Sequence, residues 1–389
     1  LYACAMDHSV APNPYRMKVQ SRMSRSCSNT LPGTQMRGLR NSVSHRNLMA
    51  STHRNSESRK RNGDVSTCAT MNDTKYQDLP SQAVNALFAF PPFFDFAAAQ
   101  ARSMMVKRGE SIGVSWQKHR ERLQDHDWET EYNQINDSGL LIPSYYQVPF
   151  HAYKTGNLSW QAAWEVDVAA KTVHAPIFDY EEGKRLDADG DACLRESYNR
   201  AMIPQLRRPV KDILDLGCAT GLSSAALQDA FPSAAITGVD LSPFFLSVGA
   251  YNQRMRRSRG VHSSSPEMRL VHAAAESTGL EAESQDLVSI CLVCHELPSE
   301  VTLRIMDEAM RVLRPGGAFA VMEMNPYSAF LDKLKKNLFA FTALKSTEPY
   351  LDEYMAFDFM GALKTRGFHL AGMQIDNSPR HRTIVAFKP

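Results

Sequence analysis

The stretch Asp215-Leu216-Gly217-Cys218-Ala219-Thr220-Gly221 joins an apolar run, residues 212–216, to a helical pattern over residues 223–231. Its glycines let the backbone approach a ligand closely, and open α/β sheets bind their ligands at the carboxyl ends of the strands. A second acid, Asp240, ends the next β-rich run, residues 235–239. An acid at that place can accept hydrogen bonds from both hydroxyls of an adenosine ribose. The pattern therefore predicts a site for a ligand that contains adenosine.

The glycine spacing argues against a dinucleotide site. A pyrophosphate-binding fingerprint would place glycines at 217, 219 and 222, but those positions hold Gly217, Ala219 and Leu222. The acid two residues before the first glycine, Asp215, instead indicates a ligand that carries a cation near the loop.

Short β-rich runs alternate with helical stretches from about residue 196, which is typical of βαβ units and a parallel sheet. We expect strands over 212–216, 235–239, 268–272, 287–294 and 318–324, and helices over 223–231, 301–313 and 358–365. Residues 368–375 and 383–387 lie too close together for a helix between them, so they should form an antiparallel hairpin. The predicted fold is α/β: a Rossmann-like, seven-stranded, mostly parallel sheet with a C-terminal hairpin, after a mainly helical N-terminal region.

Four motifs in register resemble those of the class I S-adenosylmethionine-dependent methyltransferases. Residues 215–221 resemble the loop that holds the methionine part of the cofactor, and Gly238 to Ser242 resemble the strand end that binds the ribose. Ala275-Glu276 resemble the segment that borders the adenine, and residues 313–317 resemble the turn before the fifth strand. The resemblance implies S-adenosylmethionine as cofactor and a cofactor site made of Asp215, Gly217, Cys218, Ala219, Gly221, Asp240, Leu241, Ala275, Glu276 and Cys294.

Two positions depart from the family pattern. Ala219 replaces the middle glycine and requires a negative φ if an alanine is to be tolerated there. Ala274 stands where the family often has an Asp that reaches the adenine amino group, so adenine should be held by backbone and packing.

Three further segments resemble a little-described, plastid-targeted group of plant and algal methyltransferases, in the branch similar to quinone-biosynthesis methyltransferases. These segments are Pro149 to Tyr153 with Gly156 to Leu158, Lys345 to Pro349, and Ser378 to Arg382. This likeness does not identify an acceptor.

Methyl transfer from a sulfonium needs alignment and exclusion of water, and a general base only if the acceptor must lose a proton. His295 follows the fourth strand and could be that base near neutral pH, or it could hydrogen-bond the loop. His151, a second catalytic candidate, and Tyr153 could form a lid or simply pack. Glu323 and Asn325 end the fifth strand and could contact the acceptor, whereas Glu296 is expected to be structural.

We expect no metal site, no haem attachment and no redox pair among Cys218, Cys291, Cys294 and His295. Cys291 and Cys294 should lie in one buried strand with their side chains on opposite faces, which prevents tetrahedral convergence.

Charge divides the chain into two parts. Residues 1–61 hold 11 Lys and Arg against two acids, a charge of +9, and the remainder carries −7. The leader also holds ten serines and is poor in acids, which is typical of a transit peptide for the chloroplast or, alternatively, the mitochondrion. We expect residues 1–70 to be a disordered leader, 79–195 a helical extension or lid, and 196–389 the methyltransferase domain.

The acidic body argues against polyanionic partners. We therefore expect a small, neutral or hydrophobic acceptor, no nucleic acid and no transmembrane segment, since the most apolar stretch, residues 84–99, is too short and contains two prolines. Oligomeric state is not readable from the sequence. The run Arg254, Arg256, Arg257 and Arg259 would suit RNA methylation but is better explained as a solvated loop. A further alternative is an assembly or structural subunit that retains the fold without catalysis.

Overall fold

The structure, a computed structural model, describes residues 91–149, 151, 153–179 and 185–389. The predicted leader and residues 84–90 of the apolar stretch lie outside these residues. The boundary predicted at residue 196 stays a prediction, and it falls inside one helix, α6 (Gly190–Met202).

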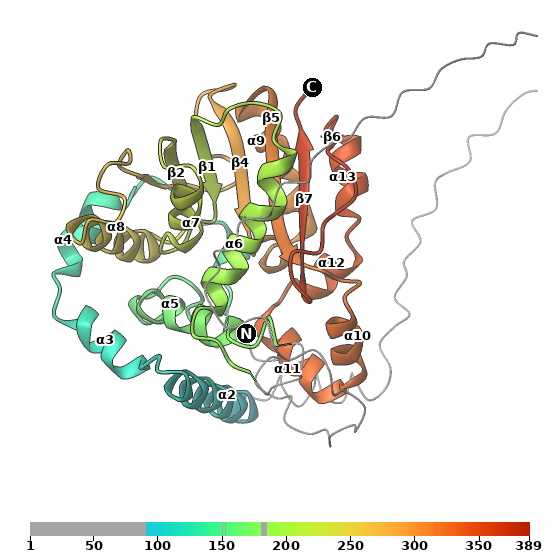
Figure 1. The fold of residues 1–389 in the computed structure, drawn as a ribbon. Helices are drawn as coiled ribbons and strands as arrows, with labels where there is room; N and C mark the ends of the chain where they lie inside the picture. Colours follow the sequence, from blue (N-terminus) through green and yellow to red (C-terminus); the bar gives the residue numbers. More distant parts are fainter. Residues whose placement is uncertain (1–90, 150, 152, 180–184) are drawn as a thin grey trace, which may run out of the picture. The chain divides into compact units, whose positions relative to one another are not determined.

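Seven strands form one sheet in the order β3-β2-β1-β4-β5-β7-β6. β1 to β5 pair in parallel with one another, and β7 runs antiparallel to both β5 and β6 (Figure 1). This arrangement confirms the predicted Rossmann-like sheet with its C-terminal antiparallel strands. The strands are β1 (Asp212–Leu216), β2 (Ala235–Asp240), β3 (Arg269–His272), β4 (Gln285–Cys291), β5 (Leu313–Met324), β6 (His369–Leu370) and β7 (His381–Phe387).

Helices cover both faces of the sheet, so its central strands are apolar on both sides. Alternate residues of β1 show the division, because successive strand residues point to opposite faces: Ile213 packs with α6 and α7 (Leu222–Ala230), and Leu214 with α9 (Ser299–Val312) and α13 (Phe359–Thr365). Burial on two faces explains why β4 is apolar throughout most of its length.

Three predicted strand boundaries are wrong. The strand predicted over 368–375 is reduced to the two residues of β6, with an isolated bridge between Ile375 and Thr383. β4 ends at Cys291, and Cys294–Glu296 form a single 3₁₀ turn, η4, so Cys291 and Cys294 do not lie in one strand. β5 begins at Leu313 because that residue already pairs with Gln285, before a shift in register carries the pairing to Ala318 and Leu287.

Three helices between β5 and α13 have no counterpart in the sequence prediction: α10 (Ala329–Lys336), α11 (Leu338–Thr347) and α12 (Leu351–Ala356). Local capping signals for two of them are present. Ser328 accepts a hydrogen bond from the Leu331 N–H, and Asn337 accepts one from the Ala340 N–H.

The N-terminal region is helical, as predicted, with α2 (Pro91–Ser111), α3 (Trp116–Gln124), α4 (Trp128–Ile135), α5 (Trp160–His174) and a 3₁₀ turn, η2 (Ser144–Tyr146). Many of its aromatic side chains pack against one another and against α8 (Pro243–Ser258). Trp128, Trp160 and Trp164 cluster with Phe245 and Val248 of α8.

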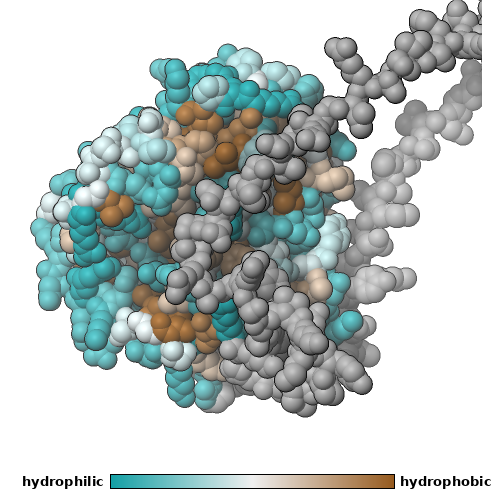
Figure 2. Space-filling view, viewed as in Figure 1, coloured by the Kyte–Doolittle hydropathy of each residue, from teal (hydrophilic) through white to brown (hydrophobic). Residues whose placement is uncertain are grey.

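The described helices include none long and apolar enough to cross a membrane. In the view of Figure 2 the described surface is mostly hydrophilic and is interrupted by separate hydrophobic patches.

Candidate active site

A cavity of about 260 Å³ lies against the residues that follow β1, β2 and β4. Of the predicted site residues, nine line it: His151, Gly217, Cys218, Ala219, Asp240, Leu241, Ala275, Glu276 and His295. Asp215, Gly221 and Cys294 are not among the lining residues. The fold therefore brings motifs that are up to 144 residues apart in the sequence to one enclosure.

The loop after β1 has left-handed backbone at three positions. Gly217 has φ 66° and Gly221 has φ 80°. Ala219 has φ 47°, which corrects the prediction of a negative φ. A left-handed conformation costs a non-glycine residue about 1–2 kcal/mol. The Ala219 N–H donates to Asp240 Oδ2 at 2.9 Å, and this bond helps to hold the residue in place.

Asp240 is buried, and its carboxylate is already well supplied with donors. Besides Ala219, the Ser242 N–H donates to Oδ1 at 2.8 Å and the Tyr146 hydroxyl donates to Oδ1 at 3.3 Å. Burial raises the pKa of Asp240 to about 6, although the two backbone donors and Tyr146 oppose the shift. The carboxylate lies where the sequence predicts the ribose, with η2 packed over it.

The end of the cavity at which adenine is predicted combines apolar packing with one carboxylate. Ala274 packs with Tyr146 and Leu241 in a small apolar cluster. The Tyr145 hydroxyl donates to Glu276 Oε1 at 2.7 Å, and Glu276 lines the cavity. That adenine is held by backbone and packing stays a prediction.

Asp215 lies behind the loop and supports it through hydrogen bonds to α7. Oδ2 accepts hydrogen bonds from the hydroxyls of Ser223 and Ser224, at 2.6 and 2.5 Å, in the first turn of α7. Burial raises its pKa, against the opposing effect of these two bonds. It therefore braces the loop against α7 and does not itself line the cavity.

Arg195 is a lining residue that sequence reasoning missed. Its Nε and Nη2 donate to Asp191, while Nη1 lies 3.5 Å from Cys291 Sγ, a weak acceptor. Burial opposes its charge, but Asp191 raises the pKa of the guanidinium further, so it stays charged. Nothing local marks this arginine, because it lies in a helix before the first motif.

His295 lines the cavity, and its environment favours the charged form over a base near neutral pH. Its Nδ1 lies 2.8 Å from Glu323 Oε2. Burial lowers the pKa of His295, but Glu323 outweighs it and the net effect raises the pKa to about 9. At pH 7 the ring is therefore an imidazolium and can donate a hydrogen bond but not take a proton.

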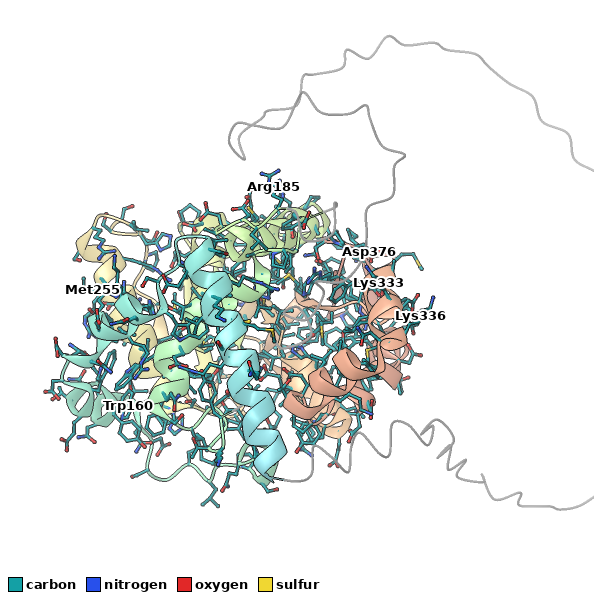
Figure 3. All side chains as sticks on the ribbon, turned by 90° about the horizontal axis from the view of Figure 1, so that it is seen from below. Trp160, Arg185, Met255, Lys333, Lys336 and Asp376 are labelled. Carbon is teal, nitrogen blue, oxygen red and sulfur yellow. The ribbon has the colours of Figure 1, made fainter. Side chains whose placement is uncertain are left out.

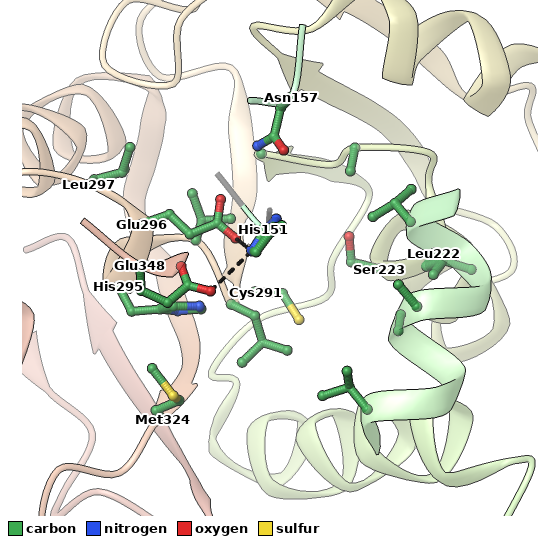
Figure 4. A pocket seen from close by; sticks show the side chains of 18 of the residues that line it. His151, Asn157, Leu222, Ser223, Cys291, His295, Glu296, Leu297, Met324 and Glu348 are labelled. Atoms are coloured by element: carbon green, nitrogen blue, oxygen red, sulfur yellow. Dashed lines mark ion pairs between the residues drawn. The ribbon is translucent and has the colours of Figure 1, made fainter. Parts of the chain in front are cut away.

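His151 also lines the cavity, whereas Tyr153 packs away from it and donates to Glu165 Oε2 at 2.7 Å. His151 Nε2 lies 3.1 Å from Glu296 and 3.2 Å from Glu348 (Figure 4). Burial lowers its pKa, but the two carboxylates raise it to about 10 overall. Glu296 is thus a cavity residue, and Glu348 was missed by sequence reasoning.

His151, Glu296 and Glu348 could each offer one ligand atom to a metal ion, and these atoms lie within 4.8 Å of one another. In the absence of a metal ion the cluster is held together by the two contacts of His151 Nε2 with the carboxylates of Glu296 and Glu348. Cys291 and Cys294 are buried thiols whose pKa burial raises. The Cys294 N–H donates to Glu323 Oε1 at 2.5 Å, so this residue positions Glu323 behind the cavity wall.

Glu323 and Asn325 do not line the cavity, which corrects their predicted contact with the acceptor. Asn325 donates to Asp376 Oδ1 at 2.9 Å. The cavity wall beyond the loop is apolar instead, and α10 and α11 provide most of it: Met324, Phe330, Leu331, Leu334 and Leu344.

The arginine run is not a solvated loop between strands. Arg254, Arg256 and Arg257 belong to α8 and have partners within the protein: Glu131, the Gly221 carbonyl, and the carbonyls of His262 and Ser265.

Residues 213–317, which hold the cavity-lining loop, match a family model described as a methyltransferase domain. This segment is therefore similar to methyltransferase domains. The match supports the predicted class I S-adenosylmethionine-dependent fold and its cofactor.

Curated relatives carry related names. A malonyl acyl-carrier-protein O-methyltransferase from Alcanivorax borkumensis is 29% identical over 163 residues, covering 41% of this chain and 52% of that protein. A demethylmenaquinone methyltransferase from Thermus thermophilus is 29% identical over 127 residues, covering 33% and 53%. The chain thus spans about half the length of these relatives.

A solved structure, an S-adenosylmethionine-dependent methyltransferase from Aquifex aeolicus, is 14% identical, with a TM-score of 0.38, and the alignment covers 49% of this chain and 89% of that one.

Proposed function

We propose that the chain transfers a methyl group from S-adenosylmethionine to a small-molecule acceptor inside an organelle, the chloroplast or alternatively the mitochondrion. One observation carries the enzymatic part: the cavity that holds the loop and Asp240 continues into the apolar wall of α10 and α11. The predicted cofactor loop and the apolar wall therefore line one and the same cavity. The organelle is supported only by the composition of residues 1–61.

The chain's own residues fit such a cofactor. Asp240 would accept from the ribose hydroxyls, Leu241 and Ala275 would border the adenine, and Arg195 Nη1 would donate to the carboxylate of the methionine part. Tyr145 and Tyr146 cover this side and would exclude water from it. The bound sulfonium supplies the activated methyl group, so these residues have only to bind and align.

The names of the relatives support methyl transfer more than any one acceptor, since they include both malonyl acyl-carrier protein and demethylmenaquinone. Membership of a quinone-biosynthesis-like branch and of a plant and algal group stays a proposal, supported by the segments quoted above.

Calorimetry of the full chain with S-adenosylmethionine tests the function. We expect saturable binding, weakened about 10- to 100-fold by Asp240→Asn, because a charge-assisted hydrogen bond contributes about 1.5–3 kcal/mol. Glu300→Gln is the matched control, since that carboxylate is exposed on α9 and lies outside the cavity. Absence of binding at millimolar cofactor would favour the non-catalytic subunit instead.

A further inference from the structure

The two sides of the cavity differ in charge. The acids Asp240 and Glu276 lie on the side assigned to ribose and adenine. Glu296 and Glu348 both face His151, which neutralises part of their charge. On the side of β5 and β7, the charged and polar lining residues are His295, Arg380 and His381, and Glu348 is near enough to His295 to interact with its charge. A further lining cation, Arg195, lies on the side assigned to the methionine part of the cofactor.

His295 lines the cavity, and one of its two ring nitrogens is already engaged. Nδ1 is engaged by Glu323 of β5, and the ring lies 6.1 Å from Tyr354 of α12. The other titratable groups around it are Glu296 of η4, Glu348 before α12, and His381 of β7. The glutamates among these neighbours raise the pKa of His295, so the imidazolium form is favoured at neutral pH. In that form Nε2 carries a proton and can donate a hydrogen bond.

Arg380 belongs to the segment Ser378 to Arg382, one of the segments that resemble the plant and algal methyltransferases. Its guanidinium carbon lies 3.9 Å from the centroid of the Phe330 ring, and Nη2 lies 3.5 Å from the Pro176 carbonyl. The Asn325 N–H donates to the Arg380 carbonyl at 2.8 Å, which fixes the backbone. A second cation is thereby placed beside the apolar wall.

Among the described lining residues, the tyrosines, thiols and histidines are poorly suited to act as a base at neutral pH, and the carboxylates of Asp240, Glu296 and Glu348 already have partners. Burial raises the pKa of the tyrosines and of Cys218 and Cys291. Burial lowers the pKa of His174 and His381, which makes both weak bases. An alcohol, a phenol or an ammonium would have to lose a proton here with little help.

We propose that the acceptor is an organic carboxylate with an apolar remainder, methylated on a carboxylate oxygen. The proposal rests on the methyltransferase function above and on the position of His295 and Arg380 beside the apolar wall. It replaces the neutral acceptor expected from net charge, because the charge of the whole surface does not determine the charge of an enclosed site.

The step balances without a base. A lone pair of the carboxylate oxygen attacks the methyl carbon, the carbon–sulfur bond breaks, and its electron pair returns to sulfur. The products are a methyl ester and a neutral thioether, and no proton moves. The apolar remainder would lie against Leu331 and Leu334 of α10, whose Lys333 and Lys336 are exposed at the outside of that helix (Figure 3).

The test compares three probes of one length on the full chain saturated with S-adenosylhomocysteine at pH 7: decanoate, decan-1-ol and decylamine. Decanoate should bind at least 10-fold more tightly than the other two. His295→Gln and, separately, Arg380→Gln should each weaken decanoate at least 10-fold and leave decan-1-ol within 2-fold. His369→Gln is the control, because this histidine is exposed on β6. Equal binding of the three probes, or of none, overturns the proposal.

A transfer assay separates this proposal from the broader one. With decanoate and tritiated S-adenosylmethionine, both at concentrations that saturate the protein at every pH tested, the product should release volatile methanol in alkali, and its rate of formation should be flat between pH 6 and pH 8. A rate that rises with pH, or an alkali-stable product, would refute a carboxylate acceptor while leaving methyl transfer intact. Failure of the chain to bind either cofactor form would refute the methyltransferase function itself.

Discussion

Lowering the pH from 7 to 5 should weaken the binding of S-adenosylmethionine about tenfold, through one carboxyl group. Asp240 is buried and has a pKa of about 6, and the ribose hydroxyls need its ionised form as acceptor. The bound cofactor favours the ionised form, so binding lowers the pKa and releases a proton below pH 6. Affinity must therefore rise with pH through 6 and become level above about 7.

The magnitude follows from the pKa. With a value of about 6, roughly nine-tenths of Asp240 is ionised at pH 7 and roughly one-tenth at pH 5. The ratio is about tenfold, or about 1.4 kcal/mol. The cofactor's own groups contribute little, because an α-carboxyl titrates near ~3.5 and an α-amino group near ~7.8.

The assay is calorimetry of the full chain at pH 5, 6 and 7 and constant ionic strength. Asp240→Asn should bind more weakly and lose the pH dependence. Asp229→Asn should keep it, since that carboxylate is 71% exposed and pairs with His262 away from the cavity. A wild-type affinity that is constant over this range would refute the reasoning. The reasoning would also be refuted if the affinity of Asp240→Asn changed with pH as much as that of the wild type. That result would attribute the pH dependence to His174 or His381.

Two further predictions concern stability. Gly217→Ala should lower the free energy of unfolding by about 2–3 kcal/mol in urea titrations, because a left-handed residue with a Cβ is strained and that Cβ would lie 2.6 Å from Val293 Cγ2. Gly372→Ala, where a Cβ meets nothing within 4 Å, should stay within about 0.5 kcal/mol, and equal losses would contradict the argument. The pKa of His151 is raised to about 10 in the folded state from an ordinary 6.5, so its stabilisation is complete below pH 6.5 and lost as pH rises through 10. The difference in unfolding free energy between wild type and His151→Gln should shrink by about 4–5 kcal/mol from pH 6 to pH 10.5, and a constant difference would exclude the ion pair.

Local chemistry explains what could be predicted of the fold. Strand, loop and helix around residues 212–230 follow from apolar runs, glycines and short-range spacing, and so does Asp240 at the end of the next strand. The same rules missed α10 to α12, because their apolar residues pack against distant elements and only their caps are local signals.

The sequence alone therefore determined the sheet, its C-terminal antiparallel strands and most of the loop and strand ends that line the cavity. Tertiary structure alone decided the charge state and the orientation of the groups within it. Glu323 of β5 makes His295 a cation, Glu348 pairs with His151 across 197 residues of chain, and Asp215 turns toward α7. The physical reason is that a pKa and a side-chain direction depend on burial and on partners brought together by folding, which no local pattern of residues specifies.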